Sequence, residues 1–196
     1  MLTNFLFQIQ HGMDHVLSLS AYAHILFLIV LAVPYLFKDW KRIFFLTIIF
    51  ILGHSVTLAL ATYHVISVNS NWIAFLIPLT ILVIALYNVF TAGKKSLNEK
   101  RSMLFFATLF FGLIHGLGFV NTFEATISNS DNKVIVLLEN ALGIEIGQLI
   151  VVFIILFIGF LCQTLFRFSK RDWVIVISAI VIGMILPMLI HNKMFA

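Results

Sequence analysis

Long apolar runs, separated by short polar segments, dominate the pattern of residues along this chain. Each run is roughly 20 residues long, which predicts helices that cross a ~30 Å hydrocarbon core at ~1.5 Å rise per residue. A membrane β-barrel is excluded, because its strands would alternate over segments of about 10 residues. The predicted spans are residues 13–37, 43–63, 72–92, 103–122, 142–166 and 173–191.

Composition supports this interpretation and removes two other protein classes. Hydrophobic residues make up 62% of the 196 residues and charged residues 10%, against ~45–50% and ~25% in soluble domains. So little polar surface cannot cover a water-soluble globule, and so apolar a chain does not stay disordered. We therefore predict an all-α polytopic membrane protein, with residues 1–196 forming a single domain of six transmembrane helices in a lipid bilayer.

The basic residues predict the orientation of the spans. Ten of the twelve fall after the first, third and fifth spans, and the positive-inside rule makes such loops cytoplasmic. Both termini then lie outside. We expect the protein to be located in a bacterial inner membrane. Short basic clusters between apolar runs also argue against nucleic acid as the partner of this +4 chain. The ten residues are Lys38, Lys41, Arg42, Lys94, Lys95, Lys100, Arg101, Arg167, Lys170 and Arg171.

One stretch does not fit six simple spans. Residues 133–166 are almost continuously apolar and would extend ~51 Å as one helix, further than the bilayer is thick. We predict a short outer segment over residues 133–138, a break near Gly143, and then the fifth span. The role of residues 123–141 is not assigned from the sequence.

Ionisable side chains inside the spans gather near the outer ends of four of them. They lie roughly 5–14 Å below the outer boundary by helical rise, and intramembrane ionisable residues are functional candidates. His11 precedes His15 by four residues on the same helical face, and its role is open between a ligand and an interface residue. The main group is His15, His54, His115, Asp14 and Glu145.

Imidazole and carboxylate together form a ligand set for divalent transition metals such as Ni²⁺ and Zn²⁺. Asp14 is a candidate partner for the second ring nitrogen of a neighbouring histidine. His24 lies ~180° around a continuous helix from His15, and we therefore assign it to packing or hydrogen bonding. His64 and His191, at outer ends, are explained by snorkelling.

Four segments carry a family resemblance. They are Gly-Met-Asp-His at residues 12–15, His-Ser-Val-Thr-Leu at 54–58, His-Gly-Leu-Gly-Phe at 115–119, and Asn-Ala-Leu-Gly-Ile-Glu-Ile-Gly-Gln at 140–148. In this order and spacing, the set resembles the HupE/UreJ family of hydrogenase- and urease-associated membrane proteins. The chain departs from that pattern in lacking a signal-like N-terminal segment and an acidic residue near the start of the third span.

The resemblance implies a polytopic protein that binds or carries nickel, possibly cobalt. On this basis, His15, His54, His115 and Glu145 would be metal-binding, with Asp14 beside them. The favoured hypothesis is therefore a divalent metal permease or delivery protein whose site faces the outside or periplasm.

The residues leave two other functions open. Three histidines around Zn²⁺ with an open water position form a known catalytic arrangement. In an intramembrane hydrolase, Glu145 or Asp14 would act as general base on a lipid or peptide from the outer leaflet. A bis-histidine haem protein is the third hypothesis, and the nearby carboxylates argue against it.

Overall fold

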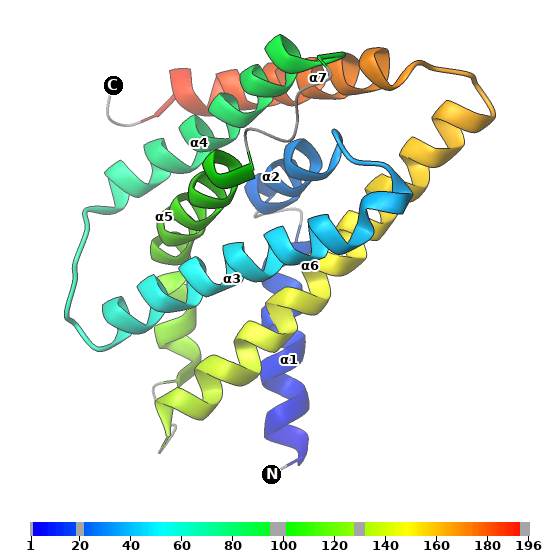
Figure 1. Ribbon diagram of the computed structural model, residues 1–196. Helices are drawn as coiled ribbons and strands as arrows, with labels where there is room; N and C mark the ends of the chain where they lie inside the picture. The colour runs from blue at the N-terminus through cyan, green and yellow to red at the C-terminus, as the bar shows by residue number, and fades with distance from the viewer. Residues whose placement is uncertain (1, 19–21, 95–100, 128–131, 193–196) are drawn as a thin grey trace.

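The computed structural model describes residues 2–18, 22–94, 101–127 and 132–192, and the regular secondary structure within them is all helical. This confirms the all-α prediction. A 3₁₀ turn, η2 (Phe37–Asp39), leads into the third helix (Figure 1). The α-helices are α1 (Leu2–Leu17), α2 (Tyr22–Ala32), α3 (Trp40–Thr62), α4 (Ser70–Thr91), α5 (Arg101–Ile127), α6 (Lys133–Thr164) and α7 (Lys170–Ile190).

Five of these helices, α3 to α7, are each long and apolar enough to cross a membrane. They overlap the five later spans predicted from the sequence. The first predicted span, residues 13–37, is not one straight helix, because α1 and α2 are bent by 72° with respect to each other. Counting the bent pair as one span, the described residues provide six.

The prediction of a break near Gly143 is wrong. Helix α6 runs without interruption for 32 residues, from an N-terminal cap in which the Asn132 side chain accepts a hydrogen bond from the Ile135 backbone. Gly143 instead lies against the Ile9 carbonyl of α1, where a Cβ would have no room. The glycine therefore serves helix contact, and the irregularity of the fold falls in the first span.

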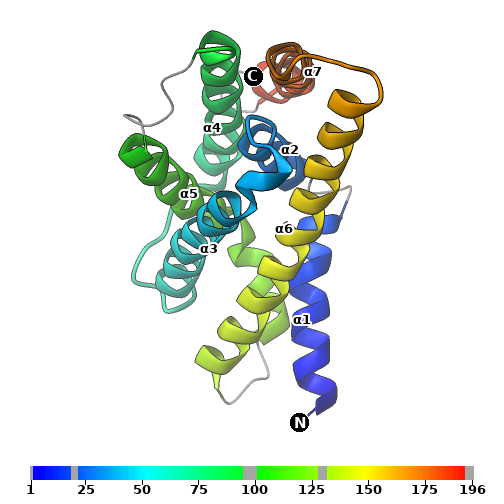
Figure 2. The ribbon, with the colours of Figure 1, turned by 45° about the vertical axis from the view of Figure 1, so that its right-hand side comes forward.

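The helices associate mainly in pairs, α3 along α5, α1 along α6, and α4 along α7 (Figures 1 and 2). Small residues allow the closest approach between helices. In α5, Gly112 faces the Phe50 carbonyl and Gly116 faces the His54 carbonyl and the Thr57 hydroxyl of α3. The contact therefore sets the position of α3 and α5, including their histidines, relative to each other.

Helix α2 is short and occupies the middle of the bundle, where it contacts α1, α4, α6 and α7 (Figure 2). Its C-terminal carbonyls lack partners within the helix. Asn88 of α4 donates its side-chain N–H to one of them, the Val30 carbonyl, at 2.7 Å. This interhelical bond fixes α2, and with it His24, among the longer helices.

We predict that Gly116→Ala destabilises the protein by about 1–3 kcal/mol, the usual effect of forcing atoms into a packed interior. Gly183→Ala is the matched control, because a Cβ at Gly183 of α7 meets nothing within 4 Å. It should be neutral or stabilising, since alanine is the better helix former. Thermal unfolding in mild detergent measures both variants, and an equal effect at the two sites would contradict the packing assignment.

Candidate metal centre

Three histidines from three helices converge near the middle of the bundle. One ring nitrogen each of His15 on α1, His24 on α2 and His54 on α3 lies within 4.8 Å of the other two. The ring centroids are 4.5 Å apart for His15 and His24 and 5.9 Å apart for His15 and His54. Small ring rotations would bring these nitrogens to one ion. We call these three residues the histidine cluster.

His115 on α5 lies directly beside the histidine cluster. Its ring centroid is 5.2 Å from that of His24, and its Nε2 is 3.4 Å from the Thr80 hydroxyl of α4. Thr80 gives its single hydroxyl hydrogen to the Ile77 carbonyl at 2.7 Å, so its oxygen accepts from His115 Nε2–H. This tautomer leaves a lone pair on His115 Nδ1, the form that binds a metal.

The ring nitrogens of the site are buried and unpaired. His54 and His115 have no exposed surface. Within the described residues, no hydrogen-bond partner reaches His15 Nε2, His24 Nε2, His115 Nδ1 or either ring nitrogen of His54. Each unsatisfied buried polar group costs about 1–3 kcal/mol. Five such nitrogens in one place therefore indicate a ligand from outside the chain, and a cation fits a set of lone pairs.

Aromatic side chains hold the histidine rings in place. Phe119 of α5 packs on His15 with ring centroids 3.7 Å apart, and its ring also lies 6.0 Å from that of His54. On the other side, Phe50 and Phe27 lie 5.4 and 5.1 Å from His115. These three phenylalanines are buried. Packing therefore orients rings that hydrogen bonds leave largely free, and it separates the site from lipid.

Two of the predicted site residues on α1 lie outside the cluster. Asp14 is exposed and is not one of the residues of the histidine cluster. His11 lies one turn away from His15 and accepts a hydrogen bond at Nδ1 from the Asn140 amide of α6, at 2.9 Å. His11 therefore links α1 to α6, in the interface role that the sequence left open.

Glu145 is not among the three residues that converge. Its Oε1 is 2.8 Å from the Thr47 hydroxyl of α3, and Thr47 precedes His54 by about two helical turns, or ~10 Å. The sequence placed Glu145 at a depth similar to that of the histidines, whereas its contact on α3 lies nearer than His54 to the basic α2–α3 loop.

The contacts of Thr47 constrain the Glu145 side chain. The Thr47 hydroxyl lies 2.7 Å from the Phe44 carbonyl as well as 2.8 Å from Glu145 Oε1. The hydroxyl donates toward both oxygens, so its single hydrogen is shared in a three-centre hydrogen bond. Glu145 is therefore tied to α3 through Oε1.

His24 is the residue that sequence reasoning missed. The expectation that it points away from His15 assumed one continuous helix through the first span. Because α1 and α2 are bent by 72°, the ~180° separation around one helix no longer applies to His15 and His24. The two rings lie side by side. The available signal was Ser18 and Ser20, which interrupt the apolar run just before His24.

Comparison with known proteins agrees with the resemblance of the motifs. A family model described as HupE / UreJ protein matches residues 1–193, and the chain therefore belongs to the HupE/UreJ family. With its five candidate spans, it is an integral membrane protein, and its family implies nickel- or cobalt-related metal handling. No curated protein and no solved structure matches the chain.

We predict that His24→Ala lowers metal affinity by well over tenfold, since even the loss of an outer partner of a ligand costs about 10–100-fold. The measurement is metal stoichiometry and affinity of untagged protein in mild detergent, by mass spectrometry and calorimetry. His64→Ala is the matched control, because His64 is exposed at the end of α3. Equal metal binding by wild type and His24→Ala would remove His24 from the site.

Proposed function

We propose that this member of the HupE/UreJ family captures a divalent transition metal, nickel or cobalt, at the histidine cluster for uptake or delivery. The observation that carries the proposal is the convergence of His15, His24 and His54 with unpaired ring nitrogens. Neutral imidazole is a good ligand for Ni²⁺, Co²⁺ and Zn²⁺. His115 is the fourth candidate ligand, through its Nδ1. The ion is thus held by side chains from α1, α2, α3 and α5.

The proposed site opens toward the outside. The basic residues at the start of α3 favour a cytoplasmic position for that end. His54 lies eight residues before Thr62, or ~12 Å from the opposite end of α3, but ~21 Å from Trp40. An ion from the periplasm of a bacterial cell would therefore have the shorter path to the cluster.

Two features support movement of the ion rather than permanent storage. Broken helices surround the substrate sites of many transporters, and the bend between α1 and α2 lies between His15 and His24. In addition, Glu145 provides a carboxyl ~10 Å from His54 toward the basic end of α3. We propose Glu145 as the next step of the route after the histidine cluster, which gives it a role in transfer and not in capture.

An intramembrane zinc hydrolase is the second candidate, because a three-histidine zinc site with an open position is a catalytic arrangement. The positions of the carboxylates count against it. Asp14 is exposed, and Glu145 is bound to Thr47 two turns from His54. Neither predicted general base lies beside the cluster, where it would have to activate a bound water.

We expect His54→Ala and His115→Ala to abolish nickel accumulation by cells that express the protein, measured as cell-associated metal after a short exposure. His191→Ala is the matched control, because His191 lies exposed at the end of α7. Expression in the membrane has to be equal for all variants. Wild-type uptake by either site variant would overturn the proposal.

Glu145→Gln separates capture from transfer. The amide oxygen of glutamine can still accept the hydrogen bond from Thr47, so the fold should persist. We expect the purified variant to bind metal as the wild type does, while uptake by cells falls by at least about tenfold, the lower range for loss of a group that supports a metal site. A variant that loses metal binding would instead make Glu145 part of the capture site.

A further inference from the structure

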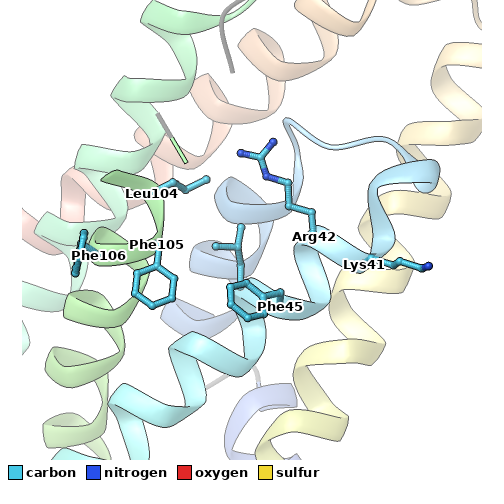
Figure 3. A pocket seen from close by; sticks show the side chains of 7 residues that line it. Lys41, Arg42, Phe45, Leu104, Phe105 and Phe106 are labelled. Carbon is cyan, nitrogen blue, oxygen red and sulfur yellow. The ribbon is translucent and has the colours of Figure 1, made fainter. Parts of the chain in front are cut away.

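A cavity of about 670 Å³ lies where the beginnings of α3 and α5 approach each other, far from the histidine cluster (Figure 3). Arg42, at its rim, precedes His54 by twelve residues, or ~18 Å along α3. Two cations from α3 border this cavity, together with Phe45 and residues 104–106 of α5. The cavity has no part in the proposed metal function.

The cavity joins a cationic rim to an apolar wall. Phe45 is 54% exposed and Phe106 64% exposed, so both present bare rings to the surroundings of the bundle. Arg42 reaches across the rim toward Leu104, whereas Lys41 extends to the other side of α3 (Figure 3). A ligand that fills this cavity must therefore satisfy one guanidinium at its head and apolar rings along its length.

Arg42 is held in place with its charge available. Its guanidinium lies 5.2 Å from the centre of the Tyr35 ring, a cation–π contact that does not neutralise the positive charge. Asp39, the acidic residue nearest in the chain, uses its Oδ2 to accept the Leu36 backbone N–H at 3.0 Å. A guanidinium fork of this kind matches the oxygens of a phosphate.

We propose that this cavity binds an anionic phospholipid from the leaflet that adjoins the basic loops. The phosphate contacts Arg42, Lys41 adds positive charge at longer range, and an acyl chain lies along Phe45, Leu104 and Phe106. Charge complementarity carries the assignment, because basic side chains at a membrane interface attract anionic lipids by about 1 kcal/mol each. A free phosphate would leave the apolar wall uncovered.

The test uses the purified protein in mild detergent, with phosphatidylglycerol, phosphatidylcholine or inorganic phosphate added. Native mass spectrometry measures retained lipid, and thermal unfolding measures stabilisation. We expect the wild type to prefer phosphatidylglycerol and Arg42→Gln to bind it about fivefold more weakly, the effect of one interfacial cation. Lys38→Gln is the matched control, because exposed Lys38 of the same loop does not line the cavity.

A second variant tests the apolar wall without changing charge. Leu104→Trp fills part of the cavity and should also weaken retention of phosphatidylglycerol. It keeps the proposal testable if Arg42→Gln does not fold. Equal binding of the two lipids by the wild type would overturn the proposal. Equal losses in Arg42→Gln and Lys38→Gln would do so too, as would stabilisation by inorganic phosphate equal to that by phosphatidylglycerol.

Discussion

The bilayer interior offers no water, so every buried polar group must find its partner within the protein or its ligand. Most of the described chain meets this constraint by forming helices, and some side chains pair between helices. Asn88 of α4 donates to the Val30 carbonyl at the end of α2, and Thr47 of α3 donates to Glu145 Oε1 of α6. These bonds join helices that are distant in sequence and hold the short central helix in place.

The histidine cluster is the main departure from that constraint. Its ring nitrogens are buried and unpaired, yet the helices that carry them are brought together by tight contacts. Gly116 lies against the His54 carbonyl, and Gly12 of α1 lies against the Asn140 carbonyl of α6. The packing energy of these contacts maintains an arrangement that the histidines alone would disfavour. The cation proposed for this site would supply the missing interaction, and metal capture would then be linked to the stability of the bundle.

The polar features lie at successive levels along α3. His54 is nearer to the Thr62 end, Thr47 with Glu145 is nearer to the start, and Arg42 borders a cavity at the start itself. The proposed steps of capture, transfer and lipid binding would therefore take place at different levels of α3. Asp14 and Glu145 both lie outside the three histidines that converge.

Much of the fold could be predicted from the sequence, because apolar runs of bilayer length must become helices whatever their neighbours are. The later spans, the close contacts at Gly112 and Gly116, and the candidacy of His15, His54 and His115 follow from periodicity, residue size and the cost of burying a polar group. The family also follows, since its motifs are local in the chain and need no knowledge of contacts.

Only the tertiary structure decided which of the polar residues meet. The bend between α1 and α2 brings His24 to His15, and the packing of α6 on α3 places Glu145 beside Thr47, about two turns before His54 along α3. Both depend on how helix ends and registers are set by packing against other helices. Local sequence determines that a segment is a helix, but rotation and depth are decided by contacts between distant segments, and these determine which side chains can share one ion.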